Sequence, residues 1–131
     1  MPSPLLLTPS ALKWRFILDG AEMAVVSGNH ESSGAPFVIR FRTAREIPVP
    51  AHWHMADENI TVLEGPYAFS LGDQYDASLL ISLPPGSHVF VPKETRHFAR
   101  YRPGTLIQVS GVGPFQSYYV NPREDGRAWI R

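Results

Sequence analysis

Turn-forming residues divide the whole chain into short segments. Thirteen prolines and ten glycines are spread along 131 residues, and the segments between them are rich in Val, Ile, Phe and Tyr. Short β-prone segments at this spacing are typical of an all-β domain, either a sandwich or a closed barrel. The predicted strands are 24–27, 37–41, 51–54, 60–63, 67–71, 79–83, 88–91, 97–101, 105–110 and 117–120.

The N-terminal segment has two interpretations. Ser10 to Leu18 is the best helical candidate, but its Trp, Phe and Ile fit a terminal strand equally well. No later segment sustains a helical period. A chain of 131 residues has room for one hydrophobic core, so we expect a single domain over residues 1–131.

The balanced charge and the absence of cysteine restrict which partners and which metal ligands the chain can have. Twelve Lys and Arg balance twelve Asp and Glu, so the chain has no net field to attract phosphate backbones or anionic lipids. We therefore expect no nucleic-acid partner and no membrane partner. Because cysteine is absent, any metal must be bound through nitrogen and oxygen. The first ten residues lack the basic start and the apolar length of a secretory signal, so the expected location is the cytoplasm.

Two histidines lie one residue apart in a predicted strand. Side chains alternate along a strand, so His52 and His54 point to the same face, roughly 6.6 Å apart, with Trp53 on the other. Glu58 has the same parity but would lie roughly 13 Å beyond His54 if the chain stayed extended. A turn at 55–57, where the residues are weak strand formers, would return Glu58 on the neighbouring strand, opposite the histidines.

A third histidine strengthens the interpretation of this pattern as a metal site. An isolated pair of alternate histidines is more often exposed to solvent than bound to metal. Here His97 follows a turn after Pro92 and opens another predicted strand. Imidazoles and a carboxylate buried together need a shared proton or metal ion to offset the cost of desolvation.

The spacing of these residues resembles the two motifs of the cupin superfamily. The first, G-x5-H-x-H-x3,4-E-x6-G, is matched by His52, His54, Glu58 and Gly65, with Glu46 in place of the leading glycine. The second, G-x5-P-x-G-x2-H-x3-N, is matched at three positions and departs at two. Gly86, Pro92 and His97 match, whereas Glu94 replaces the middle glycine and Tyr101 the asparagine.

The chain also resembles the small single-domain bacterial cupins. The shared features are the His52-Trp53-His54 run, Asp57-Glu58 and Val62-Leu63-Glu64-Gly65, a G-D-x-x-D stretch at 72–76, and a G-x-G-P-F ending at 111–115. The resemblance implies an antiparallel jelly-roll β-barrel over about 37–120, with an N-terminal strand extension before it. It further implies a homodimer, because small cupins commonly pair through an N-terminal strand. The segment 12–18 is available for such pairing.

The resemblance implies one divalent transition metal held by His52, His54, Glu58 and His97. Nitrogen and oxygen ligands suit Fe, Mn, Ni, Co or Zn, and the sequence does not choose among them. Four protein ligands in an octahedral geometry leave two adjacent positions for water, dioxygen or a bidentate substrate.

Several other residues are candidates for the pocket. Tyr67 and Phe69 share parity, although core packing explains both. Gln108 interrupts an apolar run, and its side chain either lines the pocket or faces solvent. Arg40 is a candidate to bind a carboxylate group of the substrate. The remaining histidines have simpler explanations, because His30 lies in a polar loop and His88 on a strand away from both motifs.

Two functions from different classes follow. The first is a metal-dependent enzyme that binds a small oxygen-bearing organic substrate and acts as an oxygenase, isomerase or C–C lyase. The second is a metal-containing module that binds or senses a ligand without turnover. The sequence identifies no separate acid or base, which favours the second; the many metal-dependent enzymes among cupins favour the first, which we prefer.

Overall fold

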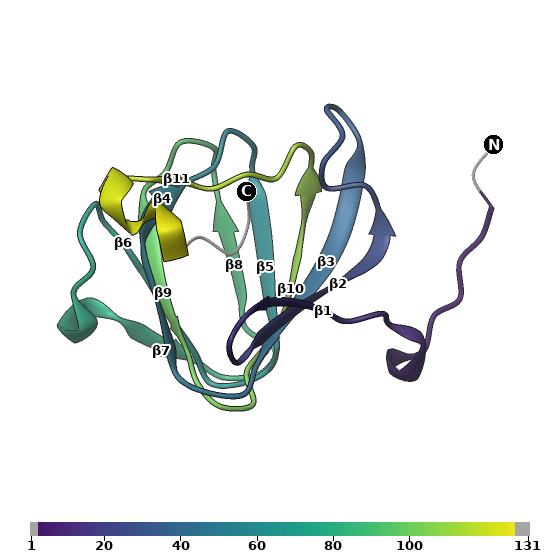
Figure 1. The fold of residues 1–131 in the computed structure, drawn as a ribbon, viewed down its shortest axis with the longest axis horizontal. Coiled ribbons are helices and arrows are strands. Elements are labelled where there is room, and N and C mark those ends of the chain that lie inside the picture. The colour runs from purple at the N-terminus through teal and green to yellow at the C-terminus, as the bar shows by residue number, and fades with distance from the viewer. Residues whose placement is uncertain (1–2, 128–131) are drawn as a thin grey trace.

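The fold consists of two antiparallel sheets that face each other (Figure 1). A computed structural model describes residues 3–127. One sheet has the strand order β1-β2-β3-β10-β5-β8 and the other β11-β4-β9-β6-β7. The strands are β1 (Arg15–Leu18), β2 (Ala21–Gly28), β3 (Pro36–Thr43), β4 (Ile47–Trp53), β5 (Glu58–Glu64), β6 (Tyr67–Leu71), β7 (Ile81–Leu83), β8 (His88–Val91), β9 (His97–Tyr101), β10 (Leu106–Val112) and β11 (Tyr118–Tyr119).

From β3 onward the chain crosses repeatedly from one sheet to the other. β3, β5, β8 and β10 belong to the six-stranded sheet, whereas β4, β6, β9 and β11 belong to the five-stranded sheet. The hairpin of β6 and β7 is the one pair of consecutive strands in this part that stays in the same sheet. This alternation is the jelly-roll arrangement, so the predicted all-β antiparallel fold is confirmed.

The N-terminal segment forms a strand instead of a helix. A short 3-10 helix, η1 (Pro9–Ala11), precedes β1, and β1 pairs with β2. The six-stranded sheet therefore begins at Arg15, earlier than the predicted start of the barrel near residue 37. Two further 3-10 helices are η2 (Ala77–Leu79), which lies between β6 and β7, and η3 (Pro122–Arg127), which follows β11. None of the helices in residues 3–127 is long and apolar enough to cross a membrane.

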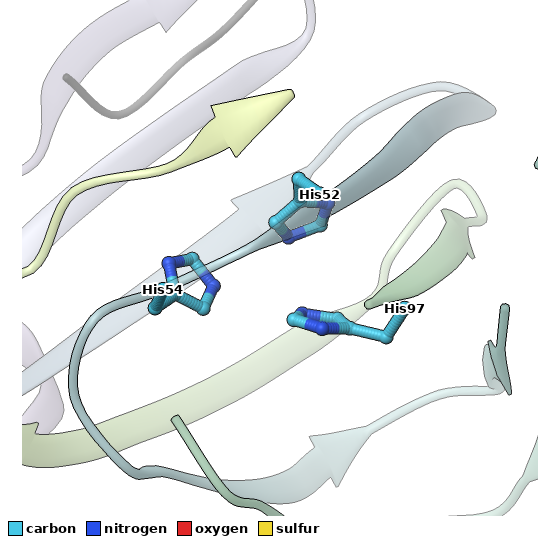
Figure 2. Close-up of side chains that lie close together, drawn as sticks. All are labelled: His52, His54 and His97. Atoms are coloured by element: carbon cyan, nitrogen blue, oxygen red, sulfur yellow. The ribbon is translucent and has the colours of Figure 1, made fainter. Parts of the chain in front are cut away.

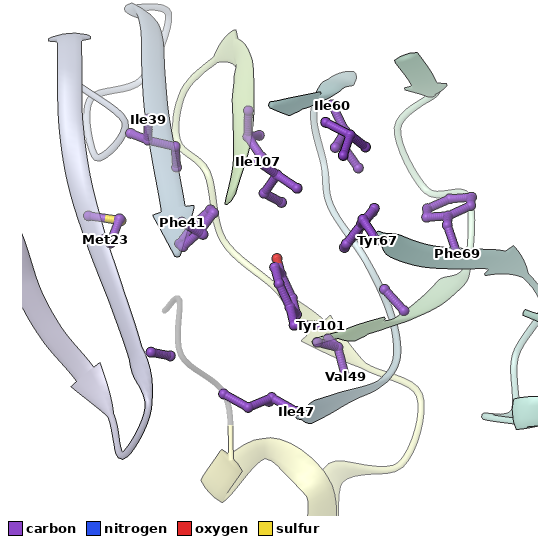
Figure 3. Packing of buried hydrophobic residues seen from close by; sticks show 14 of the residues in the cluster. Met23, Ile39, Phe41, Ile47, Val49, Ile60, Tyr67, Phe69, Tyr101 and Ile107 are labelled. Carbon is purple, nitrogen blue, oxygen red and sulfur yellow. The ribbon is translucent and has the colours of Figure 1, made fainter. Parts of the chain in front are cut away.

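The core fills the space between the sheets (Figure 3). In β3 the side chains of Phe37, Ile39 and Phe41 are buried, and the residues between them are not. In β10 Ile107 and Val109 are buried in the same alternation. Burying an apolar side chain of this size stabilises the fold by about 1.5–3 kcal/mol each. This apolar packing fixes which face of every strand points inward, including the faces that carry the histidines.

Candidate metal centre

His52 and His54 point into the interior from the end of β4. Both are buried, and Trp53 between them lies on the outer face, where it stacks on Tyr118. The alternation predicted for this segment is therefore confirmed. His52 pairs directly with His97 of β9, and the register between β4 and β9 shifts between Val49 and His52. Such bulges are frequent beside functional sites, where they redirect side chains.

Glu58 reaches the histidines from the facing sheet. The chain bends at 55–57, as predicted, and Glu58 then opens β5 with its side chain on the same inward face as Ile60. The prediction of a neighbouring strand was wrong, because β4 and β5 belong to different sheets. The carboxylate consequently faces the histidines across the interior instead of lying beside them.

Two hydrogen bonds join the turn before β5 to the turn before β9. The backbone N–H of Glu94 donates to the carbonyl of His54 at 2.7 Å. The backbone N–H of Lys93 donates to Oδ1 of Asp57 at 2.9 Å. The segment that carries His97 is thereby held against the segment that carries His54 and Glu58.

Backbone carbonyls orient all three imidazoles in the same way. Nδ1 of His52 donates to the carbonyl of Pro50 at 2.7 Å, and Nδ1 of His97 donates to that of Thr95 at 2.9 Å. Nδ1 of His54 donates to the carbonyl of Gln116 at 2.9 Å. Each ring then has its lone pair on Nε2, the tautomer that second-sphere partners impose on metal-binding histidines.

The ligand atoms of the three histidines converge. One nitrogen from each of His52, His54 and His97 lies within 4.8 Å of the other two (Figure 2). Oε1 of Glu58 lies 3.4 Å from Nε2 of His54 and 3.4 Å from Nε2 of His97. Atoms that share one ion at about 2.1 Å lie about 3 to 4 Å apart, so the two Glu58 distances fit a common cation, and the histidine nitrogens lie within a slightly wider limit.

Two of these atoms have unsatisfied hydrogen-bonding capacity. Nε2 of His54 and Oε1 of Glu58 are buried and have no hydrogen-bond partner in the described part of the chain. A lone pair on each, 3.4 Å apart, is unfavourable in a buried site unless a proton or a metal ion lies between them.

The pKa values reflect this competition for a cation. Burial, and to a smaller extent the charges of His97 and His54, lowers the pKa of His52 to about 3. For His54 burial acts in the same direction, but the nearby Glu58 carboxylate outweighs it and raises the pKa. Burial would raise the pKa of Glu58, yet the charges of His54 and His97, each 3.4 Å away, hold it well below its usual value. A metal ion bound by both His54 and Glu58 would therefore compete with a proton for the same place.

The histidines line a small, partly open cavity of about 30 Å³. The segment 113–120, here called the C-terminal strap, leads from the end of β10 to β11 (Figure 1), and its Phe115 and Ser117 line the cavity. Phe115 stacks on the ring of His54 with the ring centroids 4.5 Å apart, and Tyr119 packs on His52 at 5.5 Å. His52, His54 and His97 are at most 7% exposed, and Phe115 and Tyr119 of the strap contribute to this shielding.

Of the three residues predicted to bind substrate, one lies in the cavity and two lie on the outer surface of a sheet. Tyr67 lines the cavity with the histidines. Arg40 and Gln108 lie on the outer face of the six-stranded sheet, opposite the buried Ile39 and Val109, and Nε of Arg40 donates to Oε1 of Gln108 at 2.9 Å. Arg40 also lines a separate surface groove with Trp14 and Arg42. The two residues therefore do not extend the metal site.

The cavity contains residues that sequence reasoning did not select. Tyr101, Phe115 and Ser117 all line it. Tyr101 occupies the position where the second motif has asparagine, and this departure is the available signal. Phe115 ends the G-x-G-P-F stretch at 111–115, but that pattern does not place it in the site, and no local pattern marks Ser117.

Comparison with known proteins supports the fold only. No family profile and no curated sequence matches the chain. Solved structures do match. KdgF from Halomonas sp. is 18% identical with a TM-score of 0.67, and the match covers 84% of this chain and 94% of KdgF. An RmlC-like cupin from Shewanella frigidimarina is also 18% identical, with a TM-score of 0.67 and coverage of 84% and 91%.

Two further structures are named for an activity. The polyketide cyclase RemF from Streptomyces resistomycificus is 17% identical with a TM-score of 0.71, covering 96% of this chain and 94% of that protein. The DMSP lyase DddQ from Ruegeria pomeroyi is 20% identical with a TM-score of 0.64, covering 84% and 61%. At these identities the likeness establishes a shared architecture and transfers no activity.

Proposed function

The chain has the cupin fold, and we propose that it is a metal-dependent enzyme acting on a small oxygen-bearing organic substrate. The observation that carries the proposal is the convergence of buried Nε2 atoms and Oε1 of Glu58, two of which lack any hydrogen-bond partner among the described residues. The fold alone would not require such a cluster, because an apolar cluster of the same volume fills a barrel at lower cost.

In this proposal His52, His54, Glu58 and His97 hold one divalent transition metal. The donor set of three imidazoles and one carboxylate fits Fe, Mn, Ni, Co or Zn. The carbonyls of Pro50, Thr95 and Gln116 fix the imidazole tautomers that such an ion needs.

The proposed reaction class is oxygenation, isomerisation or C–C bond cleavage. When bound, the ion supplies Lewis acidity and, if it is Fe or Mn, redox chemistry. The protein supplies a dry apolar enclosure made by Phe41, Val49 and Ile107, which excludes water and strengthens electrostatic interactions with the substrate. Proteins of this architecture include the cyclase and the lyase described above, which supports an enzyme without selecting its reaction.

A non-catalytic role is the second candidate, and the size of the cavity favours it. A space of about 30 Å³ holds one or two water-sized groups beside a metal ion while the strap is closed. In this alternative the protein binds or senses a small ligand and the ion organises the pocket. The identity of the bound metal tests the oxygenase form of the first candidate, because Zn has no redox couple.

The test is elemental analysis of the protein purified without added metal. We expect a stoichiometric divalent metal in the wild type, with Fe or Mn supporting the enzyme and Zn arguing against an oxygenase. His54→Ala should lose most of this metal and remain folded. His88→Ala is the matched control, because His88 is exposed and hydrogen-bonded to Thr61 and Asn59 outside the cavity. Full metal content in His54→Ala would contradict the assignment.

We also propose that the protein forms a homodimer through its N-terminal region. The segment before β1 extends away from the two sheets (Figure 1), and it leaves Leu6 95% exposed. Phe16 of the edge strand β1 is 75% exposed. A second copy would cover these side chains. Light scattering should give a dimer for the wild type and for the control Leu71→Glu, and a monomer for Phe16→Glu; a monomeric wild type would refute this.

A further inference from the structure

Two tyrosines form the only hydroxyl pair deep in the cavity among the described residues. Tyr67 of β6 and Tyr101 of β9 are directly paired in register, and both are buried. Their rings pack edge to face with centroids 5.1 Å apart (Figure 3). Both line the same cavity as the three histidines and Glu58.

The hydroxyl groups of this pair are hydrogen-bonded to each other. Burial raises the pKa of both hydroxyls, and the charge of Glu58 raises it further, which places both within electrostatic reach of the metal centre. Each tyrosine has one donor hydrogen, and a single mutual bond uses only one of the two.

Packing alone does not explain the two hydroxyls. The neighbouring lining consists of apolar side chains, including Phe41, Val49 and Ile107. Phenylalanine at both positions would fill the same volume without burying polar groups, which is costly even when they are paired. The barrel therefore keeps this pair of hydroxyls at a cost.

The charges around the cavity indicate what this donor serves. Among the described residues no Lys or Arg lines it, and Arg40 lies on the outer face of the sheet. Three neutral imidazoles, the Glu58 carboxylate and a divalent cation sum to one positive charge. A buried charge of this kind is offset best by a ligand with one negative charge.

We propose that the ligand of the metal site is a small monoanion with two oxygen acceptors, such as a carboxylate or an enolate, and that Tyr67, oriented by Tyr101, donates a hydrogen bond to one of them. This inference rests on the proposed metal site. The ion takes one oxygen, and Tyr67 holds the other. The volume of about 30 Å³ restricts the ligand to a few heavy atoms while the strap is closed.

The test uses Co²⁺ as the metal and formate as the probe. Absorption of the Co²⁺-loaded protein reports metal binding first and formate binding second. We expect Tyr67→Phe and Tyr101→Phe to bind Co²⁺ like the wild type and to bind formate about 10- to 100-fold more weakly, the loss expected for a hydrogen bond to a charged acceptor. Tyr75→Phe is the matched control, because Tyr75 packs on Phe98 outside the cavity.

Urea unfolding of the metal-free protein tests a purely structural role. If the pair serves a ligand, the double variant Tyr67→Phe/Tyr101→Phe should be at least as stable as the wild type. A clear loss of stability in the double variant would overturn the inference, as would unchanged formate affinity in variants that bind Co²⁺. Failure of the wild type to bind Co²⁺ would remove the proposed metal site itself and the inference with it, a result distinct from either.

Discussion

The backbone N–H of Glu94 donates to the carbonyl oxygen of His54 at 2.7 Å, and Glu94 adopts a left-handed conformation to do so, with φ of 67°. Glu94 occupies the position where the second motif has glycine. The turn therefore keeps the backbone geometry of the motif without its usual residue. It also aligns the segment that begins β9, and with it His97, against the loop that carries His54.

Replacing Glu94 by glycine should stabilise the protein. A left-handed conformation costs a non-glycine residue about 1–2 kcal/mol, and the greater freedom of glycine in the unfolded chain offsets about 0.5–1 kcal/mol of the gain. We expect Glu94→Gly to raise the free energy of unfolding by up to about 1 kcal/mol, measured by urea denaturation. Lys93→Gly next to it should lower that free energy, because Lys93 has no positive φ to relieve. Equal effects of the two changes would contradict this account.

Much of the fold could be predicted from local sequence because turns mark the strand ends. The observed bounds of β6, β8 and β9 equal the predicted ones. β6 lies between Pro66 and Gly72, and β8 lies between Gly86 and Pro92, so the limits of both strands are set by residues that disfavour extended pairing. The two-residue period of a strand is likewise a local property, and it placed His52 and His54 on one face, which the structure shows to be the inward one.

The position of Arg40 and Gln108 could not be decided in this way. A polar residue between apolar ones indicates two faces but does not say which face meets the core. Here Ile39, Phe41, Ile107 and Val109 occupy the interior, so both polar residues point outward. The strap was also beyond local reasoning, because the contact of Phe115 with His54 joins residues far apart in the chain.

The metal-free protein should be most stable near pH 6.5. His52 has a folded pKa of about 3, below its unfolded value of 6.5, so between these values the unfolded chain binds more protons and stability falls as the pH decreases. The folded pKa of His54 is raised, so its stabilising contribution is present below 6.5 and is lost as the pH rises through that folded pKa. Urea titrations from pH 3 to 9 check this profile. His52→Asn should flatten its acid limb, and an unchanged acid limb would show that His52 is not buried in its neutral form.

Metal affinity should increase with pH through the raised pKa of His54. The ion must displace the proton that His54 shares with Glu58, so binding releases that proton. Calorimetric titrations in buffers of different ionisation enthalpy measure the number of protons released. Near neutral pH we expect release from His54 and none from His52, whose low pKa keeps it neutral. Binding without proton release below the pKa of His54 would contradict the shared site.

Glu58→Gln tests whether Glu58 is a ligand or an orienting residue. The amide keeps the volume and loses the charge that faces His54 and His97. Loss of a ligand should weaken metal binding by more than the roughly 10- to 100-fold typical of partners outside the coordination sphere. A competition assay with a chromophoric chelator measures this change. A weaker effect would leave the three histidines as the metal site and assign Glu58 to their orientation.

Access to the site should depend on the C-terminal strap. Phe115 is 5% exposed and stacks on His54, while Phe69 is 7% exposed and stacks on His97 from β6, with centroids 5.5 Å apart. Each is a buried aromatic residue beside a histidine proposed to bind the metal. They differ in that Phe115 lies on the strap, whereas Phe69 lies on β6. Truncating either to alanine should cost about 3–5 kcal/mol of stability.

Only the truncation on the strap should open the cavity to solvent. We expect Phe115→Ala to release bound Co²⁺ to excess chelator at least about tenfold faster than Phe69→Ala when both are compared at equal stability, a difference of about 1.4 kcal/mol in the barrier. Adjusting the urea concentration for each variant equalises their free energies of unfolding. Equal release rates under these conditions would mean that the ion leaves by global unfolding or by another route, and the strap would then be a fixed part of the barrel instead of its cover.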